Sequence, residues 1–305
     1  MKFGKLADIS QVDFTLPPSP SENETVLAKA PPREGKGRVY IGCTGWSMPD
    51  WVGKVYPKGT KSKDYLREYA KQFNTIEFNT THYRIPSPAN IDKWRTASTE
   101  DFRFCPKIPQ TISHSRNLGL GDEQIMLFCN TIQGLEEKLG CCFMQLPPYF
   151  GFDRLDLLDR FLKGFPNHIP LAVEFRHESW FDDPAHSQHL WSILHKHQTA
   201  TVITDVAGRR DVLHLRLTTP TAMVRFVGNA LHDSDYQRID AWVGQLNQWF
   251  QQGLHEVYFF THEPDNILAP ELAEYMANKC AENPALEVRG PHFFDNDVGQ
   301  QMSLF

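Results

Sequence analysis

The amino-acid sequence predicts an α/β fold that consists of a single (β/α)8 TIM barrel. Eight short apolar stretches recur along the 305 residues, and most of them are followed by a segment with helical periodicity. Apolar strands that alternate with helices are typical of a parallel sheet covered by helices, and eight such units can close into a barrel. A doubly wound open sheet is the alternative fold, but the GCTGW segment after the first strand lacks the G-x-G-x-x-G spacing of a phosphate loop.

The elements follow from two hydrophobic periods, two residues for strands and about 3.6 for helices. Strands are expected at residues 39–46, 75–79, 102–107, 141–147, 171–176, 199–205, 222–228 and 256–262. Helical patterns are expected at residues 62–73, 89–97, 122–139, 152–165, 185–198, 235–253 and 269–282. Only about 16 residues separate the sixth strand from the seventh, and AGRRDVLHLRLTTP has no convincing helical pattern. We therefore predict an irregular sixth crossover.

Three regions are expected along the chain. Residues 1–37 form an N-terminal extension, in which TLPPSPSENE and APPREGKG are rich in Pro, Ser and Glu and favour an extended or loosely held arm. Residues 38–285 form the barrel, and residues 286–305 form a C-terminal tail.

Composition narrows the classes of function. The hydrophobic content of 41% supports a sizeable core, and the net charge of -6 argues against a surface that coats polyanions, so any nucleic-acid contact would be local. We find no apolar run of about 18 residues and no signal-peptide pattern, so we expect no membrane span and a cytoplasmic location. The six cysteines form no CxxC pair, which indicates reduced core residues.

Polar residues gather at the expected carboxyl ends of the strands. In LAVEFRHESW, Glu174 and Arg176 lie two residues apart, so a strand points both to one face. Other strand ends carry further polar or aromatic residues: Trp46, Glu77, Asn79, Lys107, Gln145, Asp205, Arg225 and His262. In a TIM barrel these ends converge on one mouth, where active sites of this fold are found. A polar structural layer is the alternative, but a purely structural interior would hold mainly Val, Ile and Leu.

The loops after the strands add candidates. Tyr83 follows the second strand, His114 lies in the third connection and Trp180 follows Arg176. An imidazole titrates near neutral pH, so His114 is a candidate general acid or base, with bracing of a loop as the alternative. Trp46, Tyr83 and Trp180 are candidates for the wall of a pocket, with ordinary packing as the alternative.

Seven segments occur in order over roughly residues 38 to 280: GCTGWSMPDWVGKVYP, TIEFNTTHYRIP, FCPKIPQTISHSRNL, FMQLPP, AVEFRHESW, ITD and VRFVG. Together they resemble the YecE-like family, also known as domain of unknown function 72. The resemblance implies a TIM barrel with a polar mouth, and it supplies no reaction. Family members usually carry asparagine after the eighth strand, where this chain has Thr261 and His262, so no shared role is carried over to His262. The segment FGKLADISQVDFTLP resembles one branch of the family, which implies that it packs onto the barrel.

The charges favour a small anionic substrate. Lys107, Arg176 and Arg225 suit a phosphate or carboxylate, and a carboxylate or histidine would act on it. The candidate catalytic residues are Glu77, His114, Glu174 and Asp205. The candidate substrate-binding residues are Trp46, Asn79, Tyr83, Lys107, Gln145, Arg176, Trp180 and Arg225. A hydrolase or lyase of phosphoester type is the leading class.

Three alternatives stay open. One is a glycoside hydrolase that uses Glu77 and Glu174 as its carboxylate pair, although the neighbouring cations would keep both ionised. Another is a barrel that binds an anion without turning it over. The third is a divalent metal held by Glu77, Glu174 and Asp205, with His114 or His262; it is not favoured because lysine and arginines already neutralise the acids. The cofactor is otherwise unknown.

The last five residues, QMSLF, resemble the pentapeptide by which bacterial replication and repair proteins dock onto the sliding clamp. In such a tail Gln301 hydrogen-bonds in one pocket, while Leu304 and Phe305 fill an apolar one. The alternative is an apolar tail that folds back and caps the barrel. Clamp docking would connect the protein with nucleic-acid metabolism.

Overall fold

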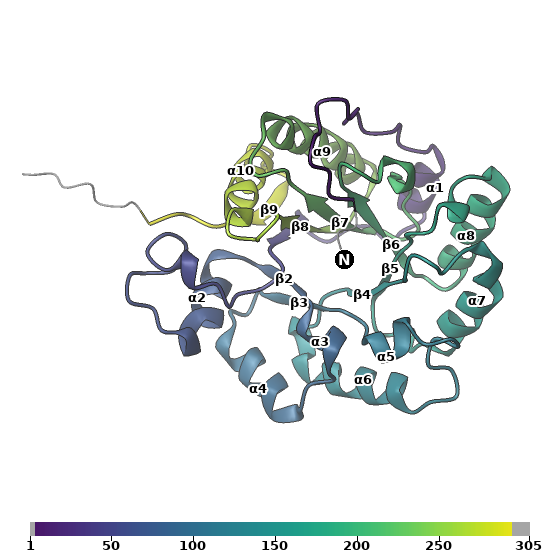
Figure 1. Cartoon of the computed structure of the whole chain (residues 1–305), viewed down its shortest axis with the longest axis horizontal. Helices are drawn as coiled ribbons and strands as arrows, with labels where there is room; N and C mark the ends of the chain where they lie inside the picture. Colours follow the sequence, from purple (N-terminus) through teal and green to yellow (C-terminus); the bar gives the residue numbers. More distant parts are fainter. Residues whose placement is uncertain (1–3, 295–305) are drawn as a thin grey trace, which may run out of the picture.

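The structure is a computed structural model and describes residues 4–294 of the chain. Strands surround a common centre and most helices lie outside them (Figure 1). The strands are β1 Gly37–Gly42, β2 Thr75–Phe78, β3 Arg103–Pro106, β4 Cys142–Gln145, β5 Leu171–Glu174, β6 Ala200–Asp205, β7 Thr221–Val227, β8 Glu256–His262 and β9 Leu286–Arg289. The helices are α1 Glu22–Ala28, α2 Tyr65–Gln72, α3 Thr80–Tyr83, α4 Pro88–Ala97, α5 Gln110–Ser113, α6 Gln124–Ile132, α7 Leu155–Gly164, α8 Pro184–Lys196, α9 Asp233–Gln252 and α10 Ala269–Ala281.

The fold is α/β with a mostly parallel sheet, as predicted. Seven strands pair in the order β4-β5-β6-β7-β8-β1-β9, and β2 pairs with β3 in a separate sheet. Each of the eight expected strand positions is occupied. The described residues do not form the continuous ladder of eight strands that a regular barrel would show, because the pairing divides into these two sheets. Strand β9 was not expected; it lies within residues 286–305 and pairs with β1 in parallel.

The first seam between the two sheets lies between β1 and β2. Glu77 N donates a hydrogen bond to Cys43 O at 3.0 Å. The two strands approach so closely that a Cβ atom on Gly42 would lie 2.2 Å from Thr75 O. Only glycine fits at position 42, because any side chain would push β2 away from β1.

The second seam lies between β3 and β4. Ile108 N donates to Phe143 O at 2.8 Å, and Gly140 N donates to Phe104 O at 2.7 Å. These backbone hydrogen bonds hold the carboxyl end of β3 beside that of β4, so the polar residues that follow the two strands stay close together.

Side chains on the strands alternate between the interior and the helices. An apolar layer fills the interior: Tyr40, Cys105, Cys141, Phe143, Ala172, Ala200, Val202, Met223, Tyr258 and Phe260. The opposite faces pack against the helices in two larger apolar clusters.

All six cysteines are buried and free, which confirms the expectation of reduced core residues. Within residues 4–294, no helix combines the length and the apolar character needed to cross a bilayer.

Local signals explain where the longer helices begin and end. Before α8, the Asp183 carboxylate accepts a hydrogen bond from Ala185 N at 2.8 Å, and Pro184 occupies the first helical position. Helix α9 ends at Gly253, whose φ of 118° lies in the left-handed region that glycine adopts without strain.

The sixth crossover is irregular, as predicted. Between β6 and β7 it contains only one short helical turn, Arg210–Val212. The N-terminal extension supplies a helix at this place: α1 packs on α9 and lies between α9 and α8 (Figure 1). The loosely held arm expected from composition is therefore wrong for this segment, because residues 22–28 are a helix that is fixed to the fold.

The buried amide of Asn23 fixes α1. Its Nδ2 donates to Leu215 O at 2.7 Å, and its Oδ1 accepts from Leu217 N at 2.8 Å. We expect Asn23→Ala to lower the free energy of unfolding by about 2 kcal/mol or more, because two buried backbone groups lose their partner. Urea unfolding measures this, and Glu24→Ala at an exposed position of the same helix should change it by less than about 0.5 kcal/mol. Equal stability of both variants would contradict a role of Asn23 in fixing the helix.

Candidate functional site

The polar side chains at the carboxyl ends of the strands form one hydrogen-bonded cluster with Arg225 at its centre. Arg225 on β7 contacts Glu77 on β2 with two parallel hydrogen bonds, Nε to Oε2 at 2.8 Å and Nη2 to Oε1 at 3.0 Å. Its Nη1 donates to Glu174 Oε2 on β5 at 2.9 Å. One guanidinium thus bridges two fully buried carboxylates from different sheets. We call this end of the molecule the mouth.

A chain of side chains continues from Glu174. Arg176 Nε donates to Glu174 Oε1 at 2.8 Å, and Gln145 Nε2 donates to Glu174 Oε2 at 2.8 Å. Lys107 Nζ in turn donates to Gln145 Oε1 at 3.0 Å. The sequence placed these four residues at one site, and the structure brings them together.

Glu77 has two further partners. Asn79 Nδ2 donates to Glu77 Oε1 at 2.9 Å. His262 Nε2 lies 2.7 Å from Glu77 Oε2, and because a carboxylate oxygen accepts, the imidazole donates here. His262 therefore belongs to the cluster, although the family resemblance gave no reason to include it.

The neighbouring cations keep both carboxylates ionised. Burial by itself would raise the pKa of Glu77, but Arg225 and the hydrogen bond from His262 outweigh it and hold the pKa well below its usual 4.5. Burial likewise opposes ionisation of Glu174, but Arg176 and Arg225 lower its pKa to about 2. At neutral pH neither group carries a proton that it could donate.

In contrast to the two carboxylates, Lys107 has surroundings that disfavour its charged form. Burial, followed by the charge of Arg225, lowers its pKa from 10.5 to about 8. Among the described residues its ammonium group has one hydrogen-bond acceptor, the neutral amide of Gln145. Lys107 is 7% exposed, so most of the side chain is withdrawn from water, and Gln145 accepts from one of its three N–H groups.

Thr204 has a polar side chain without a hydrogen-bond partner among the described residues. It lies opposite Arg225 in the register of β6 and β7, and its alternation with Val202 points it into the interior. Its hydroxyl is buried and makes no hydrogen bond to any described residue. Sequence reasoning missed Thr204 because it chose Asp205 as the polar residue at the end of β6.

Two histidines lie beside Lys107. The rings of His82 and His114 have centroids 5.4 Å apart. Burial lowers the pKa of His82 to about 4, and burial followed by the charge of Lys107 lowers the pKa of His114. His82 Nδ1 donates to Ile108 O at 3.0 Å, which leaves Nε2 as a basic nitrogen. His114 was predicted; His82 was missed, although it adjoins the predicted Tyr83.

Asp205 was predicted as a catalytic carboxylate, and the structure places it elsewhere. Ala200 and Val202 point into the interior, so alternation turns Asp205 outward, toward α9. There it accepts from Arg238 Nη1 at 3.0 Å and from Trp242 Nε1 at 2.8 Å. The prediction considered that Asp205 ends its strand, but not that side chains alternate between the two faces of a strand. Asp205 therefore holds α9 in place and does not contribute to the mouth.

The aromatic candidates do not gather into one wall. Trp180 is fully buried in the core, where its Nε1 donates to Phe150 O at 2.8 Å. Trp46 stacks on Phe78 with ring centroids 5.2 Å apart. Tyr83 is 73% exposed. Packing therefore accounts for Trp180, and the binding roles of Trp46 and Tyr83 stay predictions.

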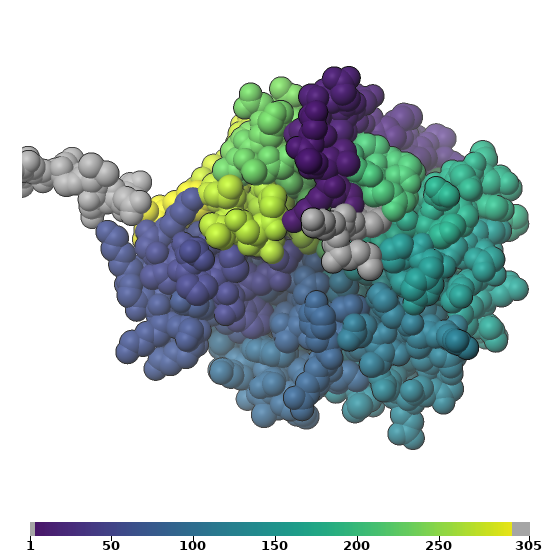
Figure 2. All heavy atoms as spheres, in the orientation of Figure 1, coloured from purple at the N-terminus to yellow at the C-terminus, as the bar shows by residue number. Residues whose placement is uncertain are grey.

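The N-terminal extension crosses the mouth. Gly4 O accepts from Gly208 N at 2.9 Å, and Lys5 Nζ donates to Pro264 O at 2.9 Å. Gly208 and Pro264 belong to the loops after β6 and β8. Figure 2 shows this dark purple segment running over the surface toward the middle of the visible face. Within residues 4–294, no group of three His, Cys, Asp or Glu side chains is arranged to hold a metal ion.

The lowered pKa of Glu174 predicts a pH dependence of stability. Because the folded pKa of about 2 lies below the usual 4.5, the ion pairs stabilise the fold above pH 4.5 and this contribution is lost as the pH falls toward 2. We expect the difference in unfolding free energy between wild type and Glu174→Gln to shrink over that range in urea titrations. Glu123→Gln, at an exposed position, should differ little from wild type at every pH. A constant difference for Glu174→Gln would refute the assignment.

Comparison with known proteins gives the family. Residues 40–292 match the family model described as protein of unknown function DUF72. The chain is 35% identical over 252 residues to UPF0759 protein YecE of Escherichia coli K12, covering 77% of this chain and 89% of that protein. It is 31% identical over 159 residues to UPF0759 protein YunF of Bacillus subtilis 168, covering 50% and 55% of the two chains.

Solved structures agree with this assignment at the level of the fold. A crystal structure of a DUF72 family protein, EF0366 from Enterococcus faecalis V583, superposes with a TM-score of 0.65 at 21% identity and covers 84% of this chain and 100% of that chain. A second crystal structure of EF0366 gives a TM-score of 0.63 at 22% identity. The chain therefore belongs to the DUF72 family.

Proposed function

We propose that the cluster at the mouth binds a small phosphate- or carboxylate-bearing molecule and acts on it as a hydrolase or lyase of phosphoester type. The observation that carries the proposal is the buried ammonium of Lys107, whose one acceptor among the described residues is a neutral amide. A buried charge is normally paired, so an anionic ligand is the natural partner of this group.

The balance of charges supports an anion. The carboxylates of Glu77 and Glu174 are already matched by Arg225 and Arg176. Protonated Lys107 adds one positive charge that no carboxylate of the cluster contacts within hydrogen-bonding distance. The unpaired hydroxyl of Thr204 on β6, between the strands of Glu174 and Arg225, is a further neutral donor.

The pKa values suit transfer of protons. With a pKa of about 8, Lys107 can hold the anion and donate a proton to a leaving oxygen near neutral pH. With their lowered pKa values, His82 and His114 are neutral at pH 7 and can accept a proton. Glu77 and Glu174 then position Arg225 and keep it charged, rather than acting as acids themselves.

The lowered pKa values of Glu77 and Glu174 favour phosphoester chemistry over glycoside hydrolysis. A glycosidase needs one protonated carboxylic acid with a raised pKa, whereas both carboxylates here have lowered ones. A protein that binds the anion without turnover is the other alternative, and turnover of phosphoester substrates distinguishes the two.

We further infer that the two sheets together act as a (β/α)8 barrel. The backbone hydrogen bonds at the two seams and the bridge from Arg225 to Glu77 support this, because each connects a strand of one sheet with a strand of the other. A crystal structure with a ligand at the mouth would display the closure directly.

The substitution Lys107→Met tests the anion site. Calorimetric titration with inorganic phosphate should detect binding to the wild type, and the variant should bind at least about tenfold more weakly because a charge-assisted hydrogen bond is lost. Lys93→Met, at an exposed position of α4, is the matched control and should bind as the wild type does. Equal binding by all three proteins would reject the site, and binding without turnover of any phosphoester would leave the non-catalytic alternative.

The C-terminal sequence supports a second proposal, docking onto a bacterial sliding clamp. Gln301, Leu304 and Phe305 lie outside the described residues, so the proposal rests on the sequence QMSLF alone. The pentapeptide offers a glutamine for a polar pocket and two apolar side chains for an apolar pocket. Docking would bring the mouth to sites of DNA replication or repair, where phosphoester substrates are abundant.

Fluorescence polarisation of a labelled peptide of residues 295–305 against bacterial clamp tests this docking. We expect binding tighter than about millimolar, and loss of at least about 2 kcal/mol of binding free energy in Gln301→Ala and Phe305→Ala peptides. The same affinity for all three peptides would show that the pentapeptide is not read by the clamp.

A further inference from the structure

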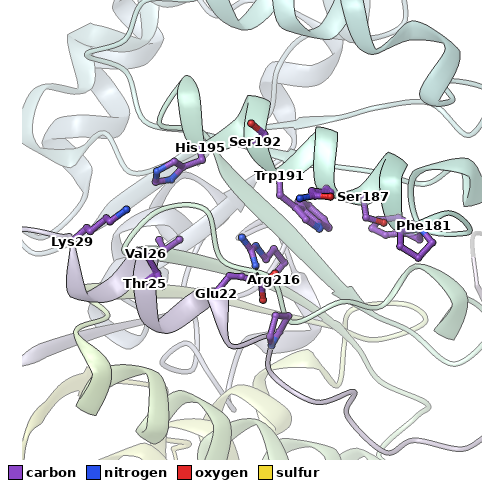
Figure 3. A pocket seen from close by; sticks show the side chains of 13 residues that line it. Glu22, Thr25, Val26, Lys29, Phe181, Ser187, Trp191, Ser192, His195 and Arg216 are labelled. Atoms are coloured by element: carbon purple, nitrogen blue, oxygen red, sulfur yellow. Dashed lines mark ion pairs between the residues drawn. The ribbon is translucent and has the colours of Figure 1, made fainter.

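A groove of about 850 Å³ lies between α1 and α8, away from the mouth (Figure 3). Its lining comes from both helices, from the residues before each helix, and from the crossover between β6 and β7. The lining includes Glu22, Lys29, Trp191, His195 and Arg216. Its volume lies within the range of small-molecule sites, which is about 300 to 1,000 Å³.

The groove results from the irregular sixth crossover. A regular unit would place a long helix between α8 and α9, whereas here the short α1 packs on α9. One stripe of α8 is left uncovered, and its residues recur at helical spacing: Pro184, Ser187, Gln188, Trp191, Ser192 and His195. The stripe carries hydroxyl, amide, imidazole and indole groups instead of the aliphatic side chains that a packed helix face requires.

Arg216 is the electrostatic centre of the groove. Its side chain is 14% exposed, and its Nη1 lies 3.2 Å from Glu22 Oε2. Its Nε is buried and has no acceptor among the described residues. Glu22 is 63% exposed, so this ion pair is weak and its carboxylate can be displaced by another anion.

Trp191 provides an aromatic surface beside Arg216. Its ring is half-buried and is supported by His214, with centroids 5.1 Å apart, and by Phe181 at 6.1 Å. Figure 3 shows Arg216 extending toward the α8 side of the groove, with Lys29 and His195 at one end. The lining thus combines an aromatic platform with two cations, Arg216 and Lys29, against one carboxylate.

We propose that this groove is a second binding site, which takes a small flat aromatic anion. The aromatic ring of the ligand stacks on Trp191, and its carboxylate, phosphate or sulfonate group accepts hydrogen bonds from Arg216. Displacement of Glu22 by the ligand frees the Nη1 group of Arg216 to donate to the anionic group. The site is separate from the anion site at the mouth and does not depend on the function proposed there.

Calorimetric titration with naphthalene-1-sulfonate tests the proposal on the full chain. The wild type should bind it, whereas 1-naphthalenemethanol, which lacks the charge, and methanesulfonate, which lacks the ring, should bind at least about tenfold more weakly. Arg216→Met and Trp191→Leu should each weaken binding of naphthalene-1-sulfonate by about tenfold or more. Glu22→Gln should strengthen it by about threefold, because a competing carboxylate is removed.

Two further measurements locate the site. Lys107→Met, which alters only the mouth, should leave the affinity for naphthalene-1-sulfonate unchanged. Hydrogen exchange should slow on ligand addition in residues 22–29 and 184–196 and not at the strand ends. The proposal is overturned if naphthalene-1-sulfonate does not bind, if Lys107→Met abolishes binding, or if Glu22→Gln leaves the affinity unchanged and exchange in the two helices is unaffected.

Discussion

The bridge that Arg225 forms between Glu77 and Glu174 is the interaction on which the rest of the mouth depends. The three side chains are buried and come from both sheets, so the guanidinium connects strands that share no ladder. Burying these charges is costly, and the cost is offset only while every oxygen keeps its donors. The buried ion pairs are therefore poor evidence that the cluster adds stability. Because an apolar layer would fill the same space at lower cost, the cluster indicates an arrangement selected for something other than stability.

Much of this arrangement could be predicted from the sequence, because two simple periods determine it. The strand positions follow from apolar stretches of the right length, and the convergence of Glu77, Lys107, Gln145, Glu174 and Arg225 follows from their places at strand ends. The division of the strands into two sheets could not be read in the same way. It depends on how closely backbones approach at the seams, and residue types report such distances only indirectly.

The errors have equally specific causes. Asp205 has the right position along its strand but points to the wrong face, because alternation from the inward-pointing Val202 turns Thr204 inward and Asp205 outward. Outside, it holds Arg238, whose guanidinium lies 4.2 Å from the ring of Phe226 and 4.8 Å from that of Phe14. A residue interpreted as part of the chemistry thus contributes to the attachment of the N-terminal extension. Thr204 was missed for the same reason, because Asp205 was chosen as the polar residue of that strand end.

The attachment of the N-terminal extension also constrains how the chain can reach its folded state. Asn23 is held by Leu215 and Leu217, which lie 192 and 194 residues later, and Lys5 is held by Pro264, 259 residues later. During synthesis this extension leaves the ribosome long before these partners exist, so its docking is complete only after β8 and its following loop have emerged. The extension thus reaches its place late, and until it docks, the crossover beside α8 stays open to solvent.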